Sequence, residues 1–343
     1  MNGYANKILD DVRAKLAPSD SVLKAARNRR GLVLDAAMGF EFALRRYNSG
    51  SIAHWTANSD LDADCGIVLD RRKYPALGPD GDGVGPNEVV EQVAELVKSA
   101  LPAANVDTSR KRAITVEFRQ PVDGQDPSVD LIVGLDRSEK PGLWIPNLWE
   151  GRWDPSHPER HTELFLGQPT PVRRIWARAV RLAKGWNIST AFEEPGLSSF
   201  NLETLAWVRM ETGMSQAEAL AEVFAFGAHS LVNDNRTPDP ADVSPPIKLL
   251  LDWQIVVARL NEAAKRMDIA LEHDDDEVAV REAVAPIFPG QLGEPDQPAD
   301  DWTSALRNKK PFSVGRSGVE VGGVAGADRV KTDVRSWVDG SAR

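Results

Sequence analysis

Apolar residues recur at helical spacing in several long stretches of the chain, and this pattern predicts amphipathic helices there. A short helix over residues 1–17 ends before Pro18, and Ser19 with Asp20 provides the N-cap of a longer helix over about residues 21–47. In the rest of the chain the same spacing predicts helices over residues 87–101, 171–187, 215–230, 246–268 and 275–287.

Shorter apolar runs predict β-strands between the first helices. A turn of proline, glycine and aspartate residues around Asp123–Asp126 separates two of these runs, so they are expected to be neighbouring strands. The predicted strands cover residues 64–72, 113–118 and 128–135.

Three tryptophans lie close together in the stretch Trp144–Trp153. Bases stack on aromatic faces, so this stretch could form a wall against a nucleotide base. The favoured interpretation is apolar packing between two parts of the fold.

The stretch from Gly50 to Asp70 carries the residues with the clearest chemistry. Its opening pair, Gly50 and Ser51, suits a backbone that comes close to an anion, because glycine leaves space and a serine hydroxyl can bind phosphate oxygens. Asp60 and Asp62 follow one residue apart, so on a strand they point to the same side.

Carboxylates placed side by side repel each other unless a cation lies between them. Hard oxygen ligands of this kind suit Mg²⁺, which is usually held by a few carboxylates together with substrate phosphates. Asp130 lies within the apolar run Val129–Val133, where an unpaired carboxylate would be costly to bury, and a metal ion is a natural compensation. Asp64 alternates onto the same side as Asp62 and is expected at the edge of such a site.

These residues, with Thr56 and Ser59, resemble the sequence motif of the DNA polymerase β-type nucleotidyltransferase superfamily. The resemblance implies that Asp60, Asp62 and Asp130 are catalytic and hold two Mg²⁺ ions, for which Mn²⁺ could substitute. It also implies that Gly50 and Ser51 bind the phosphates of a nucleoside triphosphate. The sequence departs from the family in one respect, because the eight residues between Ser51 and Asp60 make a short turn.

Two later stretches resemble a narrower group, the bacterial cGAS/DncV-like enzymes (CD-NTases), which are also similar to oligoadenylate synthases. They are Val180–Asn187, with Lys184 and Trp186 in a basic helix, and Leu197–Leu205, which begins Leu-Ser-Ser-Phe. The second stretch departs from the group at Phe200, where a tyrosine is usual. The resemblance implies that Lys184 and Ser199 contact the triphosphate; the alternative is a surface lysine and an ordinary helix cap.

The fold implied by this resemblance is α+β and two-lobed. Residues 1–165 would form a polymerase β-like palm, a mixed sheet with helices and an N-terminal spine helix, and residues 166–312 a helical lobe that closes the nucleotide cleft. Residues 313–343, rich in glycine and serine, are expected to be a mobile tail.

Composition narrows the class of partner and the cellular location. The 343 residues include 41 basic and 51 acidic side chains, a net charge of −10, which argues against a stable nucleic-acid partner and favours small nucleotides. The single cysteine, Cys65, excludes an internal disulfide and fits a reducing compartment. The chain has no apolar run near the roughly 18 residues that span a bilayer. A cytoplasmic protein without a membrane partner is therefore expected.

The resemblance implies an enzyme that joins nucleoside triphosphates into a cyclic or short linear oligonucleotide and releases pyrophosphate. In bacteria such a product would be a second messenger in antiphage (CBASS) defence, and a downstream effector protein would sense it. An alternative is a tRNA nucleotidyltransferase, either CCA-adding or a toxin that modifies tRNA ends. A third possibility, from another class, is a catalytically idle module that binds nucleotides and regulates a partner.

Overall fold

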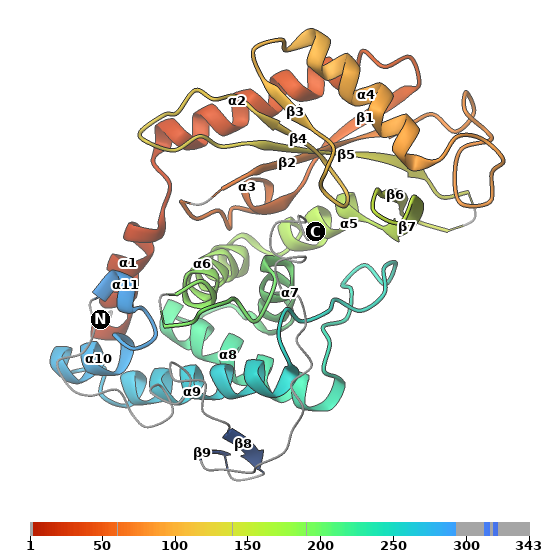
Figure 1. Cartoon of the computed structure of the whole chain (residues 1–343). Coiled ribbons are helices and arrows are strands. Elements are labelled where there is room, and N and C mark those ends of the chain that lie inside the picture. The colour runs from red at the N-terminus through yellow and green to blue at the C-terminus, as the bar shows by residue number, and fades with distance from the viewer. Residues whose placement is uncertain are drawn as a thin grey trace. The chain divides into compact units, whose positions relative to one another are not determined.

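The computed structural model describes residues 3–59, 61–138, 140–189 and 191–292, together with the backbone of residues 312–315 and 318–321 (Figure 1). The chain forms two compact units, which are described separately. The sheet unit contains Pro18–Gln168 and Asp239–Pro245, and the helical unit contains the remaining described residues.

A mixed β-sheet is the centre of the sheet unit. Five strands follow the order β1-β2-β5-β4-β3, and β6 and β7 extend the sheet from β5. The pair β2–β5 is parallel, and the other pairs are antiparallel. The strands are β1 (Ala43–Asn48), β2 (Ala63–Leu69), β3 (Asn105–Asp107), β4 (Ile114–Glu117), β5 (Val129–Asp136), β6 (Leu143–Asn147) and β7 (Arg152–Ser156). This combination of a mixed sheet and helices confirms the predicted α+β class.

Helices α2 (Asp20–Ala37) and α4 (Pro86–Ala100) cover one face of this sheet (Figure 1). Cys65 and Leu131 point toward these helices and are fully buried in the main core. Because side chains alternate along a strand, Asp64 and Asp130 point to the opposite face. The sheet therefore separates its helix-covered core from the face that carries the carboxylates.

The prediction of one helix over residues 21–47 is wrong in its second half. Helix α2 starts as predicted, with the Ser19 side chain accepting a hydrogen bond from the Val22 backbone, but it ends at Ala37. Residues 43–48 instead form β1, which pairs with β2. Gly39 interrupts the helix, and strand pairing outweighs the helical spacing of the apolar residues that follow.

The remaining predicted strands correspond to β2, β4 and β5, whereas β3 was not predicted. The Trp144–Trp153 stretch forms the hairpin β6–β7, in which Trp153 is buried in the main core. Helix α4 begins at Pro86, one residue before the predicted start, and the Asn87 side-chain amide donates to the Leu148 carbonyl at 2.8 Å. Two short helices, α3 (Gly50–His54) and α5 (Pro158–Leu166), complete the sheet unit.

The helical unit is built around two long helices that pack along each other, α8 (Gln216–Asp234) and α9 (Trp253–Glu272) (Figure 1). Gly227 of α8 lies against Leu260 and Leu205, where a side chain would be in contact with both leucines. The prediction of a helix from residue 246 is wrong at its start, because Asp252 caps α9. The other helices are α1 (Tyr4–Leu16), α6 (Thr170–Asn187), α7 (Ser199–Arg209), α10 (Glu277–Val284) and α11 (Pro289–Leu292).

The predicted tail of residues 313–343 lies largely outside the described residues, although β8 (Phe312–Gly315) and β9 (Gly318–Val321) form an antiparallel pair. In the part of the chain that the structure describes, no helix is both long and apolar enough to cross a membrane.

Candidate functional site

The Gly50–Ser51 turn is fixed directly against strand β2. Gly50 has φ +69°, and a Cβ atom built on it would lie 1.8 Å from Asp64 Oδ2, so only glycine fits this position. The backbone N–H of Ser49 donates to the Asp64 carbonyl at 3.2 Å. Ser51 follows in the first turn of α3 and is half-buried. The turn that was predicted to bind phosphate is therefore anchored at Asp64.

Strands β2 and β5 carry the predicted carboxylates at their amino-terminal ends, and this end of the strand pair is called the carboxylate edge below. Asp64 and Asp130 are register partners in this parallel pair. Asp62 lies one residue before β2, is exposed, and accepts a hydrogen bond from Ser128 Oγ at 2.5 Å. Asp62 is close enough to Asp130 for its charge to affect the pKa of the Asp130 carboxyl. Of the three predicted carboxylates, Asp62 and Asp130 are thus brought together, and Asp60 lies outside the described residues.

Asp130 is held by a short network of its own. Arg110 Nη1 donates to Asp130 Oδ2 and Thr115 Oγ1 donates to Asp130 Oδ1, each at 2.8 Å. Burial raises the pKa of the Asp130 carboxyl, the nearby Asp62 charge raises it further, and the Arg110 and Thr115 contacts oppose this without cancelling it. An additional cation at this edge would favour the ionised carboxylate.

The donor chemistry at this edge fits a hard divalent cation. Carboxylate oxygens of Asp62 and Asp130 are ligands that Mg²⁺ prefers, and burial, followed by the nearby Asp62 charge, raises the pKa of Asp130. Among the residues that the structure describes, no three histidine, cysteine or acidic side chains converge as a ready metal site. The third carboxylate required by the prediction would be Asp60.

Sequence reasoning missed Arg110 and Ser128, which contact Asp130 and Asp62. Ser128 lies two residues before Asp130, and side chains two residues apart on a strand point to the same face. This spacing could have identified Ser128 as a site residue. No local signal distinguishes Arg110 from its basic neighbours, because its contact depends on how the loop before β4 folds back.

Lys184, in the helical unit, is buried and ion-paired. Its ammonium donates to Glu203 Oε1 at 2.7 Å, and both side chains are less than a tenth exposed. Glu203 belongs to the Leu197–Leu205 stretch that carried the sequence resemblance, so the two stretches are joined by this pair. The alternative of an ordinary surface lysine does not describe Lys184.

Ser199 is exposed at the first position of α7. The cap of this helix is Ser198, whose side chain accepts from the Asn201 backbone while the Asn201 side chain accepts from the Ser198 backbone. Asn201 is itself buried and donates to Thr237 Oγ1 at 2.9 Å. The cap therefore uses Ser198 and leaves the Ser199 side chain at the surface.

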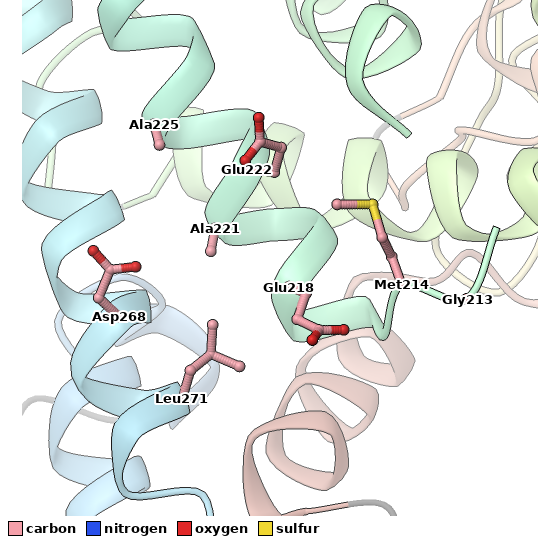
Figure 2. A pocket seen from close by; sticks show the side chains of 8 residues that line it. All are labelled: Gly213, Met214, Glu218, Ala221, Glu222, Ala225, Asp268 and Leu271. Carbon is pink, nitrogen blue, oxygen red and sulfur yellow. The ribbon is translucent and has the colours of Figure 1, made fainter. Parts of the chain in front are cut away.

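A hollow of about 440 Å³ between α8 and α9 is a different kind of site (Figure 2). Glu218 and Glu222 from α8 and Asp268 from α9 line it, together with Met214 and Leu271. Burial raises the pKa of Asp268, and the neighbouring Glu272 adds to this shift. Negative side chains on both walls oppose the binding of a triphosphate.

Several solved structures are similar to this chain in fold. The chain is similar to the CD-NTase CdnG of Bradyrhizobium diazoefficiens, solved with GTP, at 16% identity and a TM-score of 0.62 over 84% of this chain and 96% of that one. It is similar to CdnC of E. coli MS115-1, solved with ATP, at 16% identity and a TM-score of 0.62 over 85% and 99%. No protein-family model and no curated protein matches the chain by sequence.

A third structure is the Vibrio cholerae cyclic AMP-GMP synthase DncV, described as a prokaryotic cGAS homolog. The chain is 12% identical to it, with a TM-score of 0.58 over 85% of this chain and 96% of that one. At these identities the likeness concerns the fold. The chain thus has the CD-NTase fold, as its sequence motifs predicted.

Proposed function

We propose that this chain is a Mg²⁺-dependent nucleotidyltransferase that joins nucleoside triphosphates into a cyclic or short linear oligonucleotide and releases pyrophosphate. The carrying observation is the anchoring of the Gly50–Ser51 turn on Asp64, whose register partner is Asp130. This contact puts Gly50 and Ser51 close to the strand ends that carry Asp62 and Asp130, which supports the proposal. The CD-NTase fold supports the same interpretation.

In this proposal Asp60, Asp62 and Asp130 are the catalytic residues and hold two Mg²⁺ ions. When bound, such ions lower the pKa of an attacking hydroxyl and balance the charge of a departing pyrophosphate. Ser128 orients Asp62, and Arg110 and Thr115 orient Asp130, through the hydrogen bonds described above. The protein residues thereby present their oxygens from a fixed strand edge, which limits reorganisation during the reaction.

Gly50 and Ser51 are proposed to bind the phosphates of the triphosphate. Gly50 permits the close contact with Asp64 that fixes the position of Ser51, and Ser51 provides a hydroxyl in the first turn of α3.

The helical unit is proposed to contribute Lys184 and Ser199 to triphosphate binding. Ser199 is exposed and can donate its hydroxyl directly. Lys184 is engaged with Glu203, so direct contact with phosphate requires this ion pair to open. If the pair stays closed, Lys184 instead fixes α6 to α7.

The substrates are proposed to be nucleoside triphosphates. GTP and ATP are present in the structures of CdnG and CdnC, respectively. The net charge of −10 favours small nucleotides over tRNA as acceptors. We infer that the product serves as a messenger in antiphage defence in the cytoplasm and is sensed by a downstream effector protein.

The test is incubation of the full chain with labelled ATP, GTP, CTP and UTP in Mg²⁺ or Mn²⁺, with and without bulk tRNA. Products are treated with phosphatase and separated by chromatography. A phosphatase-resistant small product that Asp130→Asn abolishes and the exposed control Glu95→Gln retains is the expected result. Label found only in tRNA would instead identify a tRNA nucleotidyltransferase. Nucleotide binding without any incorporation would indicate a regulatory module.

A further inference from the structure

A second hollow, this one in the sheet unit, lies between α2 and the edge strand β1. It encloses about 420 Å³, and its charged lining is Arg27, Arg30 and Asp35 from α2 and Arg46 from β1. Asp35 and Arg46 form an ion pair across its rim. None of these residues takes part in the candidate nucleotidyltransferase site.

The charge of this hollow is opposite to that of the chain as a whole. Three guanidinium groups against one carboxylate leave a net charge of +2 in its lining, on a protein with a net charge of −10. Arginine side chains present several N–H donors in a plane, an arrangement that matches the oxygens of a phosphate. A phosphate dianion would balance this lining.

Arg30 lines this hollow and has one donor without a partner in the described part of the chain. Its Nη1 is buried and has no hydrogen-bond partner among the described residues. Burial is the main cause that lowers the pKa of Arg30, and the nearby Arg27 charge lowers it further, whereas Cys65 and Asp64 oppose this shift without cancelling it. A guanidinium nevertheless stays protonated in proteins, so an anion is the compensation that the site can accept.

Gly31 lines the hollow without adding a side chain to it. It lies in the middle of the 18-residue helix α2, where glycine costs about 1 kcal/mol relative to alanine. A Cβ atom built on Gly31 would meet no atom within 4 Å, so packing does not require glycine there. The glycine weakens the helix and leaves space beside Arg27 and Arg30.

From these observations we propose that the hollow formed by Arg27, Arg30, Gly31 and Arg46 binds the phosphate group of a small molecule. The hollow lies beside α2, which covers the sheet face opposite to Asp130, and the charge of Asp64 is near enough to affect the pKa of Arg30. It is connected to the carboxylate edge through β1, which ends at Asn48, two residues before Gly50. Binding of phosphate would hold α2 and β1 together and steady the strand that leads into the Gly50–Ser51 turn.

The test is isothermal titration calorimetry of the full chain at pH 7.5, with inorganic phosphate and glycerol phosphate as probes in separate titrations. Arg27→Gln and Arg30→Gln each remove one charged donor and are expected to weaken binding at least about tenfold. Lys98→Gln removes one exposed positive charge from α4 and should change the dissociation constant less than about twofold.

Two substitutions of Gly31 change the space in the hollow without changing its charge. Gly31→Leu fills the space and should abolish binding, whereas Gly31→Ala adds only a methyl group and should retain it while raising the melting temperature. Retention of phosphate binding by Ser51→Ala would distinguish this site from the nucleotide site, whatever the enzymatic activity proves to be.

Either probe binding more tightly supports the proposal, and the comparison tells whether free phosphate or a phosphate ester is the better ligand. The proposal is overturned if neither probe binds saturably. It is also overturned if Gly31→Leu and Arg27→Gln, both folded by circular dichroism, bind as the unmodified chain does.

Discussion

Asp64 of β2 lies directly opposite Asp130 of β5 in the parallel pair at the centre of the sheet, so two carboxylates face the same side in register. Gly50 lies against the Asp64 carboxylate, and Arg110 and Thr115 donate hydrogen bonds to the Asp130 carboxylate. The two strands therefore fix a turn and a partly balanced carboxylate relative to each other. This arrangement is fixed by backbone pairing and does not rely on flexible side chains.

Replacing Asp130 by asparagine should lower nucleotide incorporation about 100-fold or more, because charge stabilisation of several kcal/mol is at stake and each 1.4 kcal/mol is about tenfold in rate.

The same replacement of Asp130 by asparagine should raise the melting temperature at neutral pH. The folded-state pKa of Asp130 is raised, so the folded chain binds the proton more tightly than the unfolded chain does. The free energy of unfolding therefore falls as pH rises from about 4 toward that raised pKa, and asparagine removes this loss.

Calorimetric melting of both proteins, with and without Mg²⁺, provides a measurement independent of activity. Mg²⁺ should raise the melting temperature of the unmodified chain by more than that of Asp130→Asn. Equal Mg²⁺ shifts in the two proteins would contradict the assignment of Asp130 as a ligand.

Gly50→Ala should destabilise the sheet unit and reduce activity together. The substitution adds a Cβ at a positive φ and directs it at Asp64 Oδ2, so the turn must move away from β2. A cost of about 1–3 kcal/mol in the free energy of unfolding is expected. Gly124→Ala is the matched control, because Gly124 also has a positive φ (+75°) but faces open space. Chemical denaturation should show a clearly larger loss for Gly50→Ala, and equal losses would mean that contact with Asp64 is unimportant.

The candidate site could be predicted from sequence where local order sets the geometry. Asp130 falls in an apolar strand, and the Gly-Ser pair precedes a strand by a short turn, so both positions follow from alternation and turn chemistry. Arg110 could not be predicted, since its contact with Asp130 depends on the path of a loop. The burial of Lys184 was missed for a related reason, because its partner Glu203 lies in another helix.

The fold was predictable where one periodicity dominates, and less so elsewhere. Helices α4, α6 and α8 have strong apolar stripes, and their bounds fall within a few residues of the prediction. Residues 43–48 mix arginines with apolar residues and fit either period, so only the pairing of β1 with β2 decides the outcome. The three-residue strand β3 is too short for any pattern to show.

Lys184→Ala should destabilise the helical unit by about 3–5 kcal/mol, because it leaves the Glu203 carboxylate buried without its cation. The double variant Lys184→Met with Glu203→Leu removes both charges and should recover most of this loss. Thermal melting of the three proteins gives the comparison. If Lys184 also binds phosphate, the double variant should have a larger KM for the triphosphate than the unmodified chain. Full stability of Lys184→Ala would show that the ion pair is dispensable.

Asp239→Asn should lower stability at neutral pH and flatten the acid limb of the stability curve. Burial alone would raise the pKa of Asp239, but hydrogen bonds from His161 and from the Ser244 and Val243 backbones outweigh burial and hold the pKa well below its usual range. A lowered folded-state pKa stabilises the fold above the unfolded pKa, near 4, and this contribution is lost as the pH falls below it. We expect a loss of about 1–3 kcal/mol at pH 7 and a smaller difference below pH 4. Urea denaturation from pH 3 to 8 measures both, with the exposed neighbour Asp242→Asn as the control. If the free energies of unfolding of Asp239→Asn and Asp242→Asn depend on pH in the same way, the His161–Asp239 contact does not stabilise the sheet unit.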